Sequence, residues 1–154
     1  MRSITGILGR FAKCFIPMAV LSCGFSANDP IVTLGLNNGL TVGDLARRDG
    51  VTVVLVYSPE SCFSCAGVLG RWIQLDRETA DVKVELVLSR QPGDVQRRQL
   101  AIRRLVPTGV VVDENGVPAE PTAYVFTGRA LTDSAVGLPD QVALLNEFSA
   151  SGDP

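Results

Sequence analysis

Hydrophobic and polar positions alternate in a way that predicts strands and helices in turn along most of the chain. Val51–Tyr57 is a nearly unbroken β-branched run, which is typical of a strand buried on both faces of a sheet. Residues 82–88 alternate apolar and polar side chains with a period of two and predict a second strand. Residues 62–76 carry apolar side chains at helical spacing, although Gly67 and Gly70 each weaken a helix by about 1 kcal/mol. The pattern therefore predicts a strand–helix–strand unit with Val51–Tyr57 at the centre of the sheet.

The C-terminal half continues the alternation and ends in an antiparallel pair of strands. Its predicted elements are a helix over 93–104, a short strand over 110–112, a hairpin of 122–126 and 130–136, and a final helix that opens at Pro139. Val95 and Ile102 lie seven residues apart and mark one apolar face of the first of these helices. The order of elements predicts an α/β fold with a mixed sheet flanked by helices.

The segment before the central strand predicts a small β-hairpin extension. Two short β segments, residues 31–36 and 40–42, flank an Asn-Asn-Gly turn signal. Thr41 and Asp44 then have the spacing of a capping box, in which each side chain accepts a hydrogen bond from the other residue's backbone. A short helical stretch should follow and end at Gly50.

The first 23 residues are typical of an export signal. Arg2, Arg10 and Lys13 precede an apolar run with no acidic residue, and the run is shorter than the roughly 20 residues of a membrane-spanning helix. Its end resembles a bacterial lipobox, in which cleavage leaves Cys23 as the lipid-bearing residue. Ordinary cleavage after Gly24 is the alternative.

We therefore divide the chain into a signal or lipoprotein signal segment over 1–23, a tether over 24–33 and one domain over 34–150. The length of 154 residues suits a single domain. The expected location is the periplasm or the outer face of a bacterial membrane, with possible attachment through a lipidated Cys23.

Composition excludes several kinds of chemistry. The formal net charge is −2, which provides no overall basic field for nucleic acid. The chain has no histidine, so Ser-His-Asp and Cys-His catalysis and histidine-ligated metal sites are excluded. Four local arginines, at 97, 98, 103 and 104, form either a solvated helix face or a docking surface for an acidic partner.

The motif Cys62-Phe63-Ser64-Cys65 is the candidate for chemistry. It follows the predicted central strand and opens the first long helix, where unpaired backbone N–H groups favour a thiolate over a thiol. One helical turn brings the second sulfur within bonding reach of the first, so a mixed disulfide at Cys62 can be resolved by Cys65.

A metal site or a structural disulfide accounts for this motif less well. A zinc site needs two more ligands, and the other two cysteines, Cys14 and Cys23, lie in the export segment. We expect no metal and no cofactor, although a copper-handling thiol carrier stays an alternative. A purely structural disulfide between Cys62 and Cys65 would close a very short loop and constrain the unfolded chain little.

Two segments carry a family resemblance. The run Val53 to Cys65, followed about 55 residues later by Glu-Pro-Thr-Ala-Tyr-Val-Phe over 120–126, resembles the thioredoxin superfamily and its exported redoxin or TlpA-type branch. The resemblance implies a thioredoxin-like fold, with Cys62 as the attacking thiol and Cys65 as the resolving thiol. It also implies that Pro121 is the cis-proline packed against the disulfide and that Glu120 lies at the substrate-binding surface.

Pro107 also precedes a Val-rich segment and is the rival for the cis-proline. We prefer Pro121, because a β-strand, a Gly128 turn and a terminal helix follow it in the order of the family.

The departures from the family pattern change the expected chemistry. Ser61 stands where the family carries a tryptophan, and the pair between the cysteines lacks the histidine that stabilises the thiolate of strong oxidants. We therefore expect a reductant or mild exchanger. The buried carboxylate of many thioredoxins is missing, so Glu60 and Glu120 are candidate proton donors as well as ordinary surface residues. Phe63 is a candidate hydrophobic lip for substrate, or a core residue, and Ser64 a further substrate contact.

The expected function is that of a thiol-disulfide oxidoreductase of the cell envelope. Its partners would be protein thiols or disulfides and an upstream membrane or periplasmic electron donor. A non-catalytic thioredoxin-fold module that binds peptides, and the copper carrier, are the alternatives.

Overall fold

The computed structural model describes residues 29–150. The export segment and Cys23 lie outside the described residues, so cleavage and lipidation stay predictions. Within 29–150, no helix has the length and apolar character that crossing a membrane requires.

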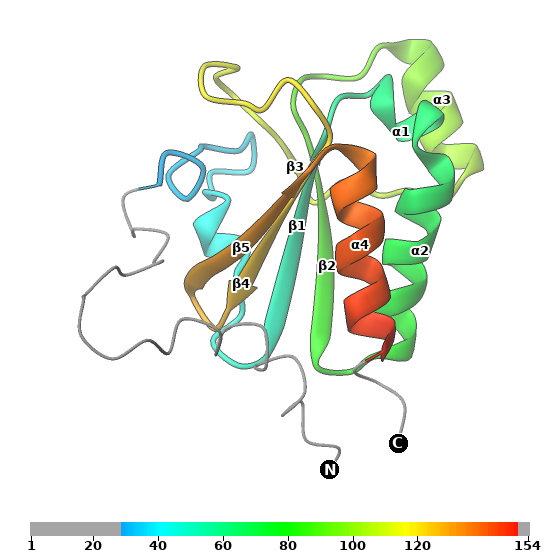
Figure 1. The fold of residues 1–154 in the computed structure, drawn as a ribbon. Coiled ribbons are helices and arrows are strands. Elements are labelled where there is room, and N and C mark those ends of the chain that lie inside the picture. The colour runs from blue at the N-terminus through cyan, green and yellow to red at the C-terminus, as the bar shows by residue number, and fades with distance from the viewer. Residues whose placement is uncertain (1–28, 151–154) are drawn as a thin grey trace, which may run out of the picture.

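A five-stranded mixed sheet forms the centre of the fold, with the strand order β3-β2-β1-β4-β5 (Figure 1). Its strands are β1 (Val51–Tyr57), β2 (Val82–Leu88), β3 (Gly109–Val110), β4 (Thr122–Thr127) and β5 (Ala130–Val136). β1 pairs in parallel with β2 and antiparallel with β4, so the β-branched run is the central strand, as predicted.

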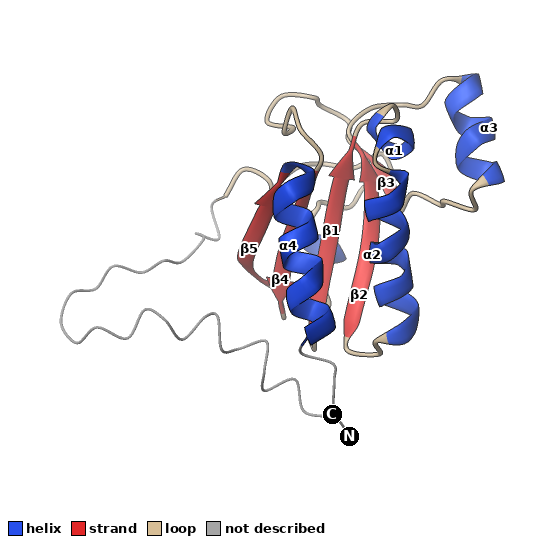
Figure 2. Cartoon of the chain, turned by 45° about the vertical axis from the view of Figure 1, so that its right-hand side comes forward, coloured by secondary structure: helices blue, strands red, loops and turns tan. Residues whose placement is uncertain are grey.

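Two long helices cover one face of the sheet. They are α2 (Ala66–Glu78) and α4 (Gly137–Ala150), and they lie side by side in both ribbon views (Figures 1 and 2). The one-turn helix α1 (Ser61–Ser64) lies at the carboxyl end of β1, and α3 (Asp94–Ile102) stands apart from the sheet at the same end. A short 3-10 helix, η3 (Gly43–Leu45), precedes β1.

Alternate residues of β1 divide the core into two layers. Val53, Leu55 and Tyr57 face α2 and α4, whereas Val54 and Val56 face the N-terminal segment on the opposite side of the sheet. All seven residues of β1 are buried, which explains why this strand has no polar alternation.

The N-terminal extension is only partly a hairpin. A single antiparallel bridge joins Gly35 to Thr41, and no regular strand forms on either side of the turn. The capping box is confirmed: the backbone N–H of Thr41 donates to the Asp44 carboxylate, and the Asp44 N–H donates to the Thr41 hydroxyl. Ile31, expected in the tether, is buried in the second core layer.

Two helix predictions need correction. The helix expected over 62–76 is broken at Cys65, whose backbone (φ −100°, ψ 16°) separates α1 from α2. The expected apolar face of α3 is wrong, because Val95 is 66% exposed and Ile102 is 80% exposed, while Leu100 is the buried residue of this helix. At 100° per residue Leu100 points almost opposite to the other two, and it belongs to the main core cluster.

Candidate active site

The strand-to-helix turn after β1 places both cysteines at the carboxyl end of the central strand. Ser58 organises this turn, since its hydroxyl accepts the Ser61 N–H at 3.0 Å and its carbonyl accepts the Cys62 N–H at 3.2 Å. The Cys65 N–H donates to the Ser61 carbonyl at 2.9 Å and closes the turn of α1. Both cysteines are free thiols, with exposed fractions of 0% for Cys62 and 5% for Cys65.

The environment of Cys62 differs from the expected activated thiolate. Burial raises its pKa from 9.0 to about 12, and the charges of Cys65 and Glu60 act in the same direction. A single-turn helix has little dipole, and its backbone N–H groups near Cys62 are already occupied. A backbone hydrogen bond at Cys62 lowers the pKa, but burial outweighs it, so the Cys62 thiol is protonated near neutral pH in this state. The raised pKa runs against the expected activation by the helix N-terminus.

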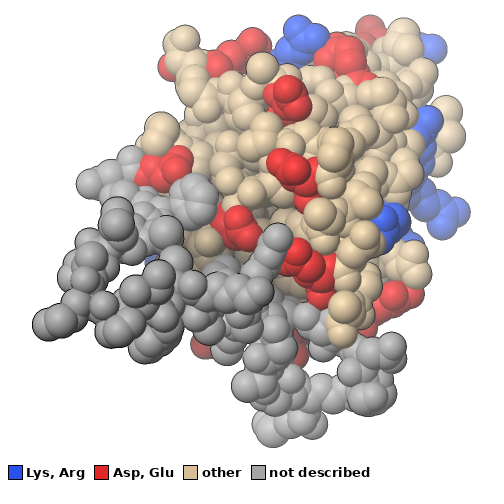
Figure 3. Space-filling view, viewed as in Figure 1, with Lys and Arg blue, Asp and Glu red and all other residues tan. Residues whose placement is uncertain are grey.

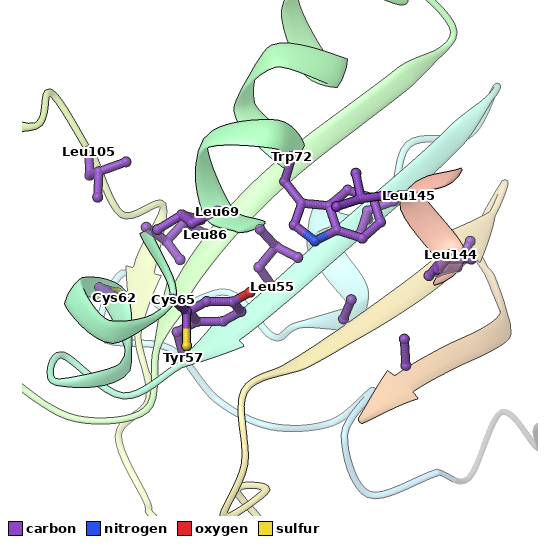
Figure 4. Packing of buried hydrophobic residues seen from close by; sticks show 14 of the residues in the cluster. Leu55, Tyr57, Cys62, Cys65, Leu69, Trp72, Leu86, Leu105, Leu144 and Leu145 are labelled. Carbon is purple, nitrogen blue, oxygen red and sulfur yellow. The ribbon is translucent and has the colours of Figure 1, made fainter. Parts of the chain in front are cut away.

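The second cysteine, Cys65, lies against a group of buried side chains, Tyr57, Trp72 and Gln141, which we name the floor of the site. Figure 4 shows the sulfur of Cys65 beside the ring of Tyr57, the last residue of β1. Burial raises the pKa of the Tyr57 phenol well above its ordinary value, and the charge of Cys65 is the next largest cause. The phenol therefore stays protonated and available as a hydrogen-bond donor.

A buried amide joins this floor to the neighbouring loop. The Gln141 side-chain oxygen accepts hydrogen bonds from the Tyr57 hydroxyl at 2.6 Å and from the Trp72 indole N–H at 3.1 Å. The Gln141 amide nitrogen donates to the Pro121 carbonyl at 2.8 Å, and the Gly137 N–H donates to the same carbonyl at 2.9 Å. Gln141 is fully buried in α4, and no buried side-chain nitrogen or oxygen in the described part of the chain lacks a partner.

Sequence reasoning did not single out Gln141 or its partner Trp72 as site residues. The available signal was a neutral amide on the apolar side of the last helix, because a buried amide needs partners. Its partners could not be named, since Trp72 and Tyr57 lie 69 and 84 residues away along the chain.

Pro121 comes directly before β4, and its peptide bond lacks the cis geometry that the resemblance implied. Thr122 pairs with Val56, so Pro121 comes directly before the part of β4 that borders the end of β1. No peptide bond in residues 29–150 is cis, so the expectation of a cis bond is wrong for Pro121 and equally for Pro107. The trans form is intrinsically favoured by about 0.5–1 kcal/mol, and in it the Pro121 carbonyl has two donors.

The two candidate substrate contacts between the cysteines, Phe63 and Ser64, differ in exposure. Phe63 is half-buried against the main core, and the Arg103 guanidinium lies 5.5 Å from its ring centre. Ser64 is exposed, and its hydroxyl donates to the Ser61 carbonyl at 3.3 Å and lies 3.6 Å from the Cys65 sulfur. Phe63 and Ser64 thus stay candidate substrate contacts.

The two carboxylates proposed as proton donors are both exposed. Glu60 forms an ion pair with Arg90 at 2.7 Å and accepts from the Gln96 amide at 2.6 Å. These partners, first of all Arg90, hold the pKa of Glu60 below its ordinary value, so it is a poor acid near neutral pH. Glu120 lies beside Pro121, with its backbone carbonyl accepting the Thr122 hydroxyl at 2.9 Å.

Metal-binding side chains do not gather here. Among residues 29–150, no three of the histidine, cysteine, aspartate and glutamate side chains lie close enough together to hold a metal ion. A copper site would therefore depend on the two thiols of Cys62 and Cys65 alone.

The fold matches that of known redox proteins. A secreted Mycobacterium tuberculosis disulfide oxidoreductase homologous to Escherichia coli DsbE superposes with a TM-score of 0.52 at 12% identity, over 79% of this chain and 98% of that one. Mycobacterium tuberculosis DsbF gives a TM-score of 0.52 at 17% identity over 79% and 98%. A thioredoxin-family thiol:disulfide interchange protein from Chlorobium tepidum gives 0.51 at 10% identity over 76% and 90%.

These likenesses establish the fold. The chain has a thioredoxin-like fold, with the C-x-x-C motif at the carboxyl end of its central strand, as the resemblance implied. By sequence, no protein-family model and no curated protein matches the chain.

Proposed function

We propose that this protein is a thiol-disulfide oxidoreductase that exchanges the Cys62–Cys65 dithiol/disulfide with protein substrates. The observation that carries the proposal is the pair of free cysteines within one helical turn, at the carboxyl end of the central strand of a thioredoxin-like fold. Structural neighbours described as disulfide oxidoreductases support the same activity.

The exchange follows from the order of the two thiols. The Cys62 thiol loses its proton and attacks a substrate disulfide, forming a mixed disulfide and releasing one substrate thiolate, which takes up a proton. The Cys65 thiolate then attacks the Cys62 sulfur and releases the second substrate thiol. The substrate gains two electrons and two protons, and the protein keeps the Cys62–Cys65 disulfide.

The electrostatics of Cys62 support the reductant or mild exchanger over a strong oxidant. Strong oxidants of this chemistry stabilise the thiolate of their reduced form. Here burial destabilises that thiolate and raises the Cys62 pKa to about 12. The chain also lacks histidine altogether, so no imidazolium offsets this effect.

Pro121, Glu120, Phe63 and Ser64 are the proposed substrate contacts. The loop that ends at Pro121 borders the end of β1, and the Gln141 amide holds its carbonyl in place. We place the activity in the cell envelope, in keeping with the export pattern of the first 23 residues, and lipid attachment at Cys23 belongs to the same proposal. An upstream electron donor of the membrane or periplasm would restore the dithiol.

Insulin reduction tests the activity. With dithiothreitol at a concentration that reduces insulin slowly by itself, the wild-type chain should accelerate precipitation of the insulin B chain, and Cys62→Ser should not. Cys65→Ser is the matched variant: it should retain a mixed disulfide with insulin on Cys62, located by peptide mapping. Equal acceleration by wild type and Cys62→Ser would remove the proposal.

One observation favours a second candidate, a non-catalytic module that binds peptides. Cys62 has no exposed surface, so a substrate disulfide reaches it only after the α1 turn moves. The same insulin assay separates the two functions, because a binding module would not accelerate insulin reduction with the wild-type chain or with Cys62→Ser.

A further inference from the structure

Helix α3 carries exposed apolar side chains on its outward face, where they do not pack against the rest of the protein. Val95 is 66% exposed and Ile102 is 80% exposed, and Val106, just after the helix, is 84% exposed. At 100° per residue Arg98 falls beside Val95 and Ile102 on the same side of the helix, opposite Leu100, which is buried. We name Val95, Arg98 and Ile102 the α3 stripe. Exposed apolar side chains gathered on one face mark interaction sites more often than scattered ones do.

The charge around the stripe is opposite to that of the chain as a whole. The segment 93–106 holds four arginines and one aspartate, although the whole chain has a formal net charge of −2. Arg97 is paired with Asp94 at 2.5 Å, but in the described part of the chain Arg98, Arg103 and Arg104 form no ion pair. In the space-filling view, Lys and Arg gather toward the side where α2 and α3 lie, whereas acidic side chains run across the front (Figure 3).

Two contacts tie this helix to the candidate active site. Arg103, which follows α3, lies with its guanidinium 5.5 Å from the ring of Phe63, between the two cysteines. The Gln96 amide donates to Glu60, which immediately precedes α1. Both ribbon views place α3 at the same end of the sheet as α1 (Figures 1 and 2). A chain lying along α3 would therefore reach the C-x-x-C motif.

We propose that the α3 stripe docks an acidic segment with apolar side chains, carried by the protein that exchanges electrons with Cys62 and Cys65. The identification of the bound protein as a redox partner rests on the proposed function. The acidic and apolar character of its docking segment is inferred from the residues of the α3 stripe. Glutamate or aspartate side chains of the partner pair with Arg98, and its apolar side chains cover Val95 and Ile102.

A plain solvated face does not explain the stripe as well. A solvated face accounts for the arginines but not for two β-branched residues exposed beside them. An anionic membrane surface would meet the same arginines, and the binding test below includes it as an outcome.

Binding to synthetic peptides tests the stripe without any redox step. The full 154-residue chain is titrated with a fluorescent ten-residue peptide made of Glu, Leu and one Ser, which contains no cysteine. It is also titrated with the same peptide carrying Lys in place of Glu. The Glu peptide should bind at least tenfold more tightly at low salt, with the preference shrinking as salt rises. Arg98→Glu should weaken its binding about tenfold, and Ile102→Ser by about threefold.

The matched control is Arg77→Glu, the same charge change at the last turn of α2, far from α1 along that helix. Its binding should stay within twofold of wild type. Equal binding of the two peptides, or equal loss in the Arg77 and Arg98 variants, overturns the proposal. Binding to phosphatidylglycerol vesicles that depends on Arg98, without any peptide preference, also overturns it and assigns the stripe to a membrane.

A kinetic arm separates this proposal from the proposed function. The reduced chain is reacted with the disulfide-linked dimer of a cysteine-containing Glu/Leu peptide and with the small neutral 2-hydroxyethyl disulfide. Arg98→Glu should slow the peptide reaction about tenfold and leave the small disulfide unchanged. If the chain reduces neither disulfide, the proposed function fails, while the binding titration still decides the fate of the stripe.

Discussion

The floor beneath the cysteines and the outer face of α3 are built by opposite rules. In the floor, Tyr57, Trp72 and Gln141 are fully buried, and each polar atom has a partner inside the protein. On α3, Val95 and Ile102 are exposed and contribute little to packing. Side chains in the floor therefore determine whether the site keeps its shape, whereas side chains on α3 are free to serve recognition at little cost in stability.

The largest expected contrast comes from Trp72. This indole packs edge-to-face on Phe148, with ring centres 6.0 Å apart, and is fully buried. Trp72→Ala should lower the free energy of unfolding by about 3–5 kcal/mol, because a large cavity forms in the floor. Urea denaturation followed by circular dichroism measures this. A loss below about 1 kcal/mol would mean that the floor is not the stabilising region.

Removal of the buried amide should have the next largest effect. Gln141→Leu leaves the Tyr57 hydroxyl and the Trp72 indole N–H buried without an acceptor, so the free energy of unfolding should fall by about 2–4 kcal/mol. Gln74→Leu is the matched control, since its amide reaches only Glu78 on the same helix, in an exposed hydrogen bond. Equal losses in the two variants would contradict the assignment of stability to the floor.

The raised pKa of Cys62, above the floor, predicts how the alkylation rate of this thiol depends on pH. Alkylation of Cys62 by iodoacetamide should accelerate about tenfold per pH unit from pH 8 to 11, without the plateau of an ordinary thiol near its pKa of 9.0. Fragmentation mass spectrometry of the tryptic peptide 49–71, which carries both cysteines, follows the rate at Cys62. A plateau below pH 9 would show that Cys62 is an activated thiol after all.

The same shift has a consequence for stability. The folded state holds the Cys62 proton up to about pH 12, while the unfolded chain releases it from about pH 9.0, so this contribution is complete below pH 9.0 and is lost as the pH rises toward 12. Cys62→Ser should flatten that part of the stability curve. An unchanged slope in the variant would trace the loss to other groups, such as the buried Tyr57 phenol.

The smallest effect is expected on the outer face. Ile102→Ser and Val95→Ser should each change the free energy of unfolding by no more than about 0.5 kcal/mol, because both side chains are already exposed to water. The same denaturation curves measure this, with Leu100→Ser as the matched buried control. A loss of more than about 1 kcal/mol at Ile102 would mean that α3 packs more tightly than the structure indicates.

The sequence predicted the parts of the fold that repeat regularly. The β-branched run of β1, the alternation in β2 and the hairpin of β4 and β5 each depend on local periodicity and on burial, and all are confirmed. The outward face of α3 was mispredicted, because periodicity identifies an apolar face without showing that anything covers it. Leu100 is the residue of α3 that is buried, and its role follows from the tertiary arrangement.

The site shows the same division. The C-x-x-C motif and the position of Pro121 before β4 follow from short segments. The burial of Cys62 and the Gln141 hydrogen bonds depend on chain segments far apart in sequence. No spacing within one segment carries that information.

Reversible dithiol/disulfide exchange at Cys62 and Cys65 is most directly tested by a redox titration. The full chain is equilibrated in dithiothreitol buffers of graded poise, free thiols are alkylated, and peptide 49–71 is weighed by mass spectrometry. A single two-electron transition between the species with two alkylated thiols and the species with one internal disulfide is the expected result, at a potential on the reducing side of protein disulfide isomerase, roughly −180 mV. If peptide 49–71 never forms an internal disulfide at any poise, the two sulfurs do not act as a redox pair.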